Sequence, residues 1–252
     1  MSTQPAGHAR QYLGMMAASI AALVLLVSPA SAADGQHSRT VLKRLTVAAD
    51  PMTEAFGARV VMPLDVKNAS RWADVLRRQE ASLAAPAACA DPAADQCFAS
   101  FWAETVAELQ TLPRDAQVRR VNDLVNRMRY WSDWDVYRKA DHWATPEEMF
   151  EKMGGDCEDF ALFKYFLLRA AGVPAEDLRM TLVASDDQAH MVSLVMVDGA
   201  PVVMDCVVLR AAPPAELRQY QAVYSLSETG AWFLVAADEP AGVQTALAEQ
   251  SR

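Results

Sequence analysis

Apolar residues in the first half of the chain recur every three or four positions, the spacing that places them on one face of an α-helix. The clearest stripe runs over residues 69–83 and contains Trp72, Val75, Leu76, Gln79 and Leu83. The same spacing predicts further helices over 98–112, 114–131 and 157–171. A short helix is expected to begin at Thr145, because Pro146 and Glu148 complete a capping box with that residue.

The periodicity changes after residue 177 to an alternation of apolar and polar positions, which is typical of half-buried β-strands. It predicts strands over 178–184, 190–197, 201–209, 219–225 and 231–236. Asp198-Gly199 favours a two-residue hairpin turn between the second and third of these strands. Helices that come first and an antiparallel sheet that comes second predict a fold of the α+β class.

The N-terminal segment differs from the rest, and we interpret residues 1–32 as a signal peptide. Its apolar run from Leu13 to Val27 is short for a membrane span, and small residues precede a predicted cleavage after Ala32. An uncleaved membrane anchor is the alternative. Residues 33–252 are expected to form a single domain with its core at about 50–237. The net charge of −9 argues against a nucleic-acid partner, because nucleic acids bind basic surfaces.

One cysteine stands out by its surroundings, the polar hexapeptide Gly154-Gly155-Asp156-Cys157-Glu158-Asp159 at the start of an apolar helix. Unpaired N–H groups and the positive end of the helix dipole gather at such a position. They lower the pKa of a thiol and offer donors to an oxyanion, so Cys157 is predicted to be a nucleophile. The alternative is a buried structural cysteine.

Two residues of the predicted sheet would complete this chemistry. His190 opens an apolar strand after a polar loop and is predicted to be the general base, with His142 as the rival histidine. Asp205 follows across the hairpin turn and is predicted to orient the imidazole. Each has a structural alternative: a surface or core histidine, and an aspartate paired elsewhere.

Three carboxylates, those of Asp156, Glu158 and Asp159, crowd around the cysteine. Like charges raise the pKa of a thiol and oppose formation of the thiolate. A divalent cation bound by these oxygens would remove the conflict, and Ca²⁺ suits oxygen ligands. The alternative is that the carboxylates complement the helix dipole.

The remaining cysteines raise the question of disulfides, which exported proteins can hold. Cys89 and Cys97 flank an Ala-, Pro- and Asp-rich stretch that would let their Cα atoms approach. A disulfide between them is predicted, and two free thiols are the alternative. Cys206 is expected to pack in an apolar run. A disulfide between Cys157 and Cys206 is the other pairing, and it would block the nucleophile.

These residues resemble the bacterial transglutaminase-like cysteine proteinase family, that of the LapG-type periplasmic proteases. The resemblance rests on Trp143-Ala144-Thr145-Pro146-Glu147, Gly155-Asp156-Cys157-Glu158-Asp159 leading into Lys164-Tyr165, His190-Met191-Val192 and Asp205. It implies a papain-like α+β fold, a Cys157–His190–Asp205 triad and dependence on Ca²⁺. The metal ligands it implies are Asp156 and Glu158, with Asp159 and Asp141 as further candidates.

The resemblance also implies a biological setting. Such proteases are periplasmic, cleave the N-terminal region of large surface adhesins and so release cells from biofilms. An inner-membrane receptor that senses cyclic di-GMP sequesters them. The leading hypothesis is therefore a calcium-dependent adhesin endopeptidase. Acyl transfer of the transglutaminase or amidase type with the same triad is a second hypothesis, and a non-catalytic calcium- or receptor-binding module is a third.

Overall fold

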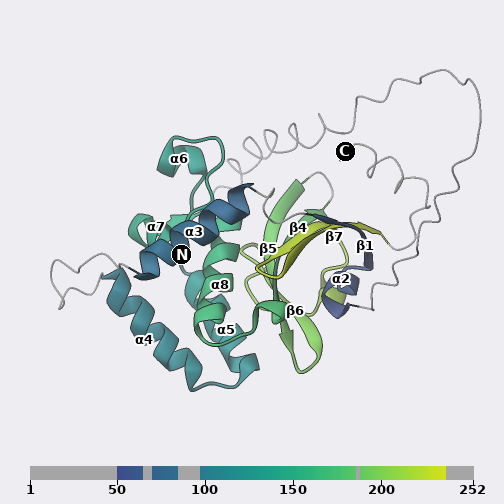
Figure 1. Ribbon diagram of the computed structural model, residues 1–252, viewed down its shortest axis with the longest axis horizontal. Helices are drawn as coiled ribbons and strands as arrows, with labels where there is room; N and C mark the ends of the chain where they lie inside the picture. The colour runs from purple at the N-terminus through teal and green to yellow at the C-terminus, as the bar shows by residue number, and fades with distance from the viewer. Residues whose placement is uncertain (1–49, 65–69, 85–96, 186–187, 237–252) are drawn as a thin grey trace, which may run out of the picture.

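Helices and sheet form two adjoining layers in the computed structural model, with helix α8 (Cys157–Ala170) between them (Figure 1). The structure describes residues 50–64, 70–84, 97–185 and 188–236. The predicted signal peptide at 1–32 and the residue Cys89 lie outside these ranges. Within these ranges, every helix is too short or too polar to cross a membrane.

The helices predicted from the apolar stripes are present. The longer ones are α3 (Ser70–Ala84), α4 (Phe98–Gln110), α5 (Arg114–Val125), α7 (Pro146–Lys152) and α8, and two short ones are α2 (Pro51–Glu54) and α6 (Asp133–Tyr137). The capping box at Thr145 is confirmed. The backbone N–H of Glu148 donates to the Thr145 hydroxyl at 3.3 Å, and the N–H of Thr145 donates to the Glu148 carboxylate at 2.9 Å.

The prediction of one helix over 114–131 is wrong in its last third, because α5 ends at Val125. Arg129–Tyr130 instead forms strand β2, which pairs in parallel with β3 at Gly154–Gly155. A Cβ atom on Gly154 would lie 2.1 Å from the carbonyl oxygen of Arg129, so only glycine lets the two backbones approach this closely. This pairing places Tyr130 beside the segment that leads into Cys157.

The predicted antiparallel sheet is confirmed, with six strands in the order β1-β8-β7-β4-β5-β6. Their bounds are Ala58–Leu64 for β1, Leu178–Ser185 for β4, Gln188–Val197 for β5, Ala200–Met204 for β6, Gln221–Ser227 for β7 and Gly230–Ala236 for β8. Val197 pairs with Ala200 across the predicted turn. Positive φ angles of 50° at Asp198 and 80° at Gly199 match the tight turn that a two-residue hairpin needs.

The strand predicted over 201–209 is too long, since β6 ends at Met204. Asp205 lies immediately beyond it, and its carboxylate accepts from the N–H of Val207 at 2.8 Å. Such a local turn competes with strand pairing. The carbonyl of Asp205 is taken up by the helical layer, where it accepts from Lys164 Nζ at 2.8 Å and Asn126 Nδ2 at 2.9 Å. Asp205 is thus fixed at the boundary between the two layers.

Helix α8 forms the centre of the larger hydrophobic core, and its residues from Glu158 to Leu168 are all buried. On β5, Met191 and Val195 face this core, whereas Val192 and Leu194 face a second core on the other side of the sheet. Ser193 Oγ donates to the carbonyl of Ala161 at 2.7 Å and ties β5 to α8. The alternation along β5 therefore sets which side each residue of this strand faces, including His190 at its start.

Candidate active site

Cys157 is the first residue of α8, as predicted, and it is partly buried. Asp156 is the N-cap residue, and its backbone N–H donates to Asp159 Oδ2 at 3.3 Å. A Cβ atom on Gly155 would lie 2.3 Å from that same oxygen, so glycine is required there. The glycine pair and this capping hydrogen bond hold the cysteine at the helix mouth, where first-turn N–H groups have no partner within the helix.

The predicted base and its orienting carboxylate are brought together. Nε2 of His190 lies 3.3 Å from both carboxylate oxygens of Asp205. The imidazole comes from the start of β5 and the carboxylate from the end of β6, so the hairpin at Asp198-Gly199 creates this pair. Because Nε2 faces Asp205, Nδ1 is the ring nitrogen left for a reacting group.

Tyr220 is a third member of this arrangement that the sequence pattern did not single out. Its hydroxyl donates to Asp205 Oδ2 at 2.5 Å, and its ring meets that of His190 edge-on at 5.1 Å and 80°. Burial favours the neutral form of Asp205, but the hydrogen bonds from His190 and Tyr220 hold its pKa below the ordinary value. Tyr220 thus fixes both the carboxylate and the ring.

Cys157 contacts Cys206, the residue that follows Asp205. The thiol of Cys206 donates to Cys157 Sγ at 3.1 Å, whereas the described residues contain no hydrogen bond between Cys157 and His190. The distance of catalytic hydrogen bonds is often longer before substrate binds. The structure therefore forms the His190–Asp205 pair and places Cys157 against Cys206, the residue next to Asp205.

The expected lowering of the Cys157 pKa is not found for the protein chain by itself. The hydrogen bond from Cys206 and burial raise the pKa of the Cys157 thiol, and the charges of Glu158 and Asp156 raise it further. The carboxylates that the sequence raised as a conflict thus add to the larger effects of the Cys206 hydrogen bond and of burial on the Cys157 pKa. The helix N-terminus alone does not outweigh them.

The acidic residues near the cysteine form a compact cluster with unused ligand atoms. Four buried carboxylate oxygens, Asp133 Oδ1, Asp141 Oδ1, Asp156 Oδ1 and Glu158 Oε1, have no hydrogen-bond partner. Two overlapping trios have ligand atoms within 4.8 Å of one another: Asp133, Asp141 and Glu158, and Asp133, Asp156 and Asp159. Buried carboxylates without partners are costly, so this donor set fits a bound divalent cation.

All four predicted ligand candidates thus come together, and the residue common to both trios is Asp133, which the sequence analysis missed. Asp133 is the first residue of α6, a one-turn helix that no apolar stripe predicts. Its second oxygen accepts from the N–H of His142 at 2.5 Å. The two oxygens of Asp159 accept from the N–H groups of Ala144 at 2.7 Å and Asp156 at 3.3 Å, so this carboxylate also has a structural role.

The electrostatics of the cluster reflect its burial. Desolvation raises the pKa of Glu158 to about 7 and that of Asp133 to about 6. Desolvation and neighbouring carboxylates raise the pKa values of Asp156 and Asp159 well above normal. Burial and mutual repulsion thus disfavour the ionised forms of these carboxylates, and a nearby positive charge would favour them.

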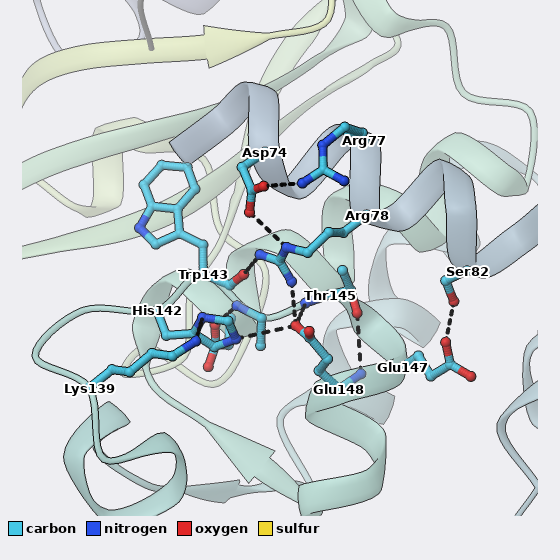
Figure 2. Close-up of polar contacts among 12 residues, drawn as sticks. Asp74, Arg77, Arg78, Ser82, Lys139, His142, Trp143, Thr145, Glu147 and Glu148 are labelled. Carbon is cyan, nitrogen blue, oxygen red and sulfur yellow. Dashed lines mark hydrogen bonds and ion pairs between the residues drawn. The ribbon is translucent and has the colours of Figure 1, made fainter. Parts of the chain in front are cut away.

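The rival histidine belongs to another network, which joins α3 to α7 (Figure 2). His142 Nε2 lies 3.3 Å from Glu148 Oε2, and its Nδ1 lies 3.2 Å from Lys139 Nζ. Arg78 donates to the same Glu148 oxygen at 2.5 Å and to the carbonyl of Trp143 at 2.5 Å. His142 is thus a structural residue of this network, and it leaves His190 as the histidine paired with a buried aspartate.

Aromatic and aliphatic side chains border the site. Tyr130 and Val207, which flank the cysteine segment and Asp205 in the structure, are 52% and 65% exposed. Trp143 is buried in the core, in keeping with a packing role. Elsewhere, Cys97 is disulfide-bonded, whereas Cys157 and Cys206 are free. The predicted partner of Cys97, Cys89, lies outside the described residues.

The chain is similar to known proteins both in sequence and in structure. Residues 86–238 match the model of the bacterial transglutaminase-like cysteine proteinase (BTLCP) family. The calcium-bound structure of LapG from Legionella pneumophila is 26% identical, covering 71% of this chain and 98% of its own, with a TM-score of 0.51. The EGTA-treated structure of the same protein is 28% identical, covers 71% and 97%, and has a TM-score of 0.50. A search of curated proteins gave no match.

Proposed function

Since the chain belongs to the bacterial transglutaminase-like cysteine proteinase family, we propose that it is a calcium-dependent cysteine endopeptidase with Cys157, His190 and Asp205 as its triad. The family and the LapG likeness confirm the predicted transglutaminase-like α+β fold and a LapG-type cysteine protease. The observation that supports the triad is that Cys157, at the mouth of α8, contacts Cys206, whose neighbour Asp205 is paired with His190.

In the proposed reaction, the sulfur of Cys157 attacks the carbon of the scissile carbonyl and its proton passes to Nδ1 of His190. First-turn N–H groups of α8, that of Cys157 among them, stabilise the oxyanion. The C–N bond then breaks, His190 gives the proton to the leaving amine, and an acyl-enzyme remains. A water molecule, deprotonated by His190, hydrolyses that thioester and frees Cys157. Asp205 keeps the imidazole in the required orientation throughout.

Calcium is the cation that we assign to the acidic cluster, held by Asp133, Asp141, Asp156 and Glu158, whose free oxygens support the proposal. When bound, it supplies positive charge beside the nucleophile and opposes the effect of the carboxylates on the Cys157 thiol. Asp159 then serves mainly to fix the first turn of α8, because both of its oxygens accept backbone hydrogen bonds. The calcium in the LapG structure gives independent support for this choice of metal.

The substrate, partner and compartment are proposed from the family resemblance. We assign the N-terminal region of a large surface adhesin as substrate, with biofilm release as the result. An inner-membrane cyclic di-GMP receptor is the proposed partner that sequesters the protease. The predicted signal peptide supports a periplasmic location.

The test uses the mature chain and a purified N-terminal fragment of a candidate giant repeat adhesin. The wild-type protein should cut the fragment once, and Cys157→Ala should not cut it although it folds normally. Chelator should abolish cutting by the wild type, and calcium should restore it better than magnesium, which demands stricter octahedral geometry.

Each arm has its own contradicting outcome. Cleavage by Cys157→Ala would overturn the protease assignment. Indifference to chelator would remove calcium while leaving the triad. Incorporation of a labelled amine in place of cleavage would favour acyl transfer, and binding to the fragment or receptor with neither reaction would favour a non-catalytic module.

A further inference from the structure

The sulfur of Cys157 has a second sulfur as its nearest polar partner. Cys206 Sγ lies 3.1 Å from Cys157 Sγ, although the two residues are 49 positions apart in the chain. A disulfide bond is about 2.05 Å long, so the pair needs to close by only about 1 Å to become covalent. This proximity is produced by the tertiary fold, because Cys157 opens α8 and Cys206 follows the end of β6.

The side chain of Cys206 is the group that can make this small movement. Cys206 lies in a bend between β6 and the isolated β-bridge of Ala212 with Val203, outside any helix or strand. Its neighbours Val207 and Leu209 are 65% and 64% exposed. Both cysteines are themselves partly exposed, so a small oxidant can reach the pair. Cys157 is by contrast fixed at the start of a buried helix, so Cys206 is the partner that moves.

The same chain already contains a disulfide at Cys97, which indicates that it functions where protein thiols become oxidised. A thiol pair at the reactive sulfur would meet the same conditions. Redox-sensitive cysteines typically have a low pKa, are accessible and often have a resolving cysteine beside them. Of these properties, the geometry of Cys157 and Cys206 supplies the accessibility and the neighbouring sulfur.

We propose that Cys157 and Cys206 form a reversible disulfide that switches the site off, with a peroxide as the oxidant and a small dithiol as the reductant. In the forward direction, one thiol reduces hydrogen peroxide, giving a sulfenic acid and one molecule of water. The other sulfur attacks it, the S–S bond forms as the S–O bond breaks, and a second water leaves with the remaining thiol proton. A dithiol reverses the reaction by thiol–disulfide exchange and becomes a cyclic disulfide itself.

Two consequences follow for the site. The disulfide occupies the sulfur that would attack the substrate, so cleavage stops while the pair is oxidised. It also protects that sulfur, because the trapped disulfide cannot proceed to the sulfinic acid, an irreversible form. Cys206 is thus a resolving cysteine that keeps oxidation of the nucleophile reversible.

The part of this inference that concerns activity depends on the proposed function, so the experiment reads the bond and the activity separately. Wild type and Cys206→Ser are treated with hydrogen peroxide, digested without reductant, and analysed by mass spectrometry for the peptide pair that contains Cys157 and Cys206. Identified peptides are used because the Cys97 disulfide would confuse a total thiol count. Adhesin cleavage is measured before oxidation, after it, and after dithiothreitol, each protein being compared with its own reduced activity.

Wild type should give the cross-linked peptide pair, lose at least roughly a hundredfold in cleavage rate, and recover almost fully in dithiothreitol. Cys206→Ser should lose activity without a cross-link and fail to recover, because its Cys157 passes to the sulfinic acid. Thermal melting curves of both reduced proteins verify that the variant is folded.

Several outcomes separate the two proposals. Absence of the cross-linked pair in oxidised wild type would overturn the switch and leave the protease assignment intact. Equal recovery of Cys206→Ser and wild type would also overturn it, since no resolving cysteine would then be needed. A cross-link that forms without loss of cleavage would instead overturn the assignment of Cys157 as nucleophile.

Discussion

The carboxylate of Asp205 and the cluster of carboxylates around Asp133 differ in how many of their oxygens accept hydrogen bonds from the protein. Asp205 is almost fully buried, yet its carboxylate accepts hydrogen bonds from Tyr220 and Val207 and lies beside His190. The cluster around Asp133 is buried as well, but it leaves four carboxylate oxygens without a partner. A buried acid whose oxygens are hydrogen-bonded is held in one orientation by the fold, whereas buried acids with unpaired oxygens fit the cation site of the proposed function.

The largest expected effect comes from breaking the paired side. Asp205→Asn removes the charge that orients and stabilises the His190 imidazole, and we expect kcat/KM to fall roughly a thousandfold. The measurement is the rate of adhesin cleavage at saturating calcium, with circular dichroism as the control for folding. Retention of nearly full activity would show that His190 does not depend on Asp205.

The unpaired side is tested through calcium. Asp133→Asn removes the residue common to both trios, so calcium should stabilise the variant much less than the wild type. For the wild type at about 100 times the Kd, the expected gain in unfolding free energy is about 2.7 kcal/mol. Thermal melts with calcium or chelator measure it, and Asp123→Asn, which changes an exposed carboxylate on α5, is the matched control. Equal gains in the two variants would contradict a site at Asp133.

A finer test removes one hydrogen bond from the paired side. Tyr220→Phe keeps the ring that meets His190 and deletes the hydroxyl that donates to Asp205. A buried hydrogen bond to a charged group contributes about 1.5–3 kcal/mol. The substitution should therefore lower the free energy of unfolding by an amount in that range. Cleavage should slow about tenfold through kcat, with KM little changed, since the tyrosine is a positioning residue. Chemical denaturation and steady-state kinetics measure the two effects.

The smallest expected effect is on how stability depends on pH. The cluster around Asp133 and the paired Asp205 should change stability in opposite directions as pH changes. Glu158 and Asp133 have pKa values raised to about 7 and about 6, so the folded state binds their protons more tightly than the unfolded state. Their contribution to stability is therefore complete below the unfolded pKa and is lost as pH rises through the folded pKa. Asp205, whose pKa is lowered, loses its contribution only in more acidic solution.

In chelator, the Tm should thus rise by roughly a few degrees as pH falls from about 7 to about 5. With saturating calcium the rise should disappear, because the cation holds the carboxylates in their ionised form. Melting curves at pH 5, 6 and 7 with and without chelator would measure this difference. A Tm that falls on acidification in chelator would contradict the raised pKa values.

Much of this architecture could be predicted from periodicity and local motifs. The stripe around Trp72, the capping box at Thr145 and the turn at Asp198-Gly199 are local signals, and each is confirmed. Cys157 could be predicted because a helix N-terminus is recognisable from the local sequence and is a position that activates a thiol. Periodicity predicted the α+β class, and the family resemblance added its papain-like form and the Asp141 candidate.

The errors and omissions arise where distant segments decide the structure. The helix over 114–131 ends early because Arg129–Tyr130 pairs with the glycines at 154–155, a contact that no local pattern contains. Tyr220 and Asp133 lie in irregular or one-turn segments, and their partners come from other elements or loops at no fixed spacing. The contact of Cys206 with Cys157 also depends on the tertiary fold. The apolar sequence around Cys206 is what a cysteine that merely packs in the core would have.

The position of Asp205 has a consequence for when the enzyme can work at all. Its carbonyl is held by Lys164 and Asn126 from the helical layer, while its carboxylate serves the histidine of the sheet. A polypeptide that has been synthesised only as far as α8 has a sulfur but neither base nor orienting acid. With the proposed triad, the site becomes complete only when β5 and β6 have docked against α8, so a chain made only as far as α8 would be inactive.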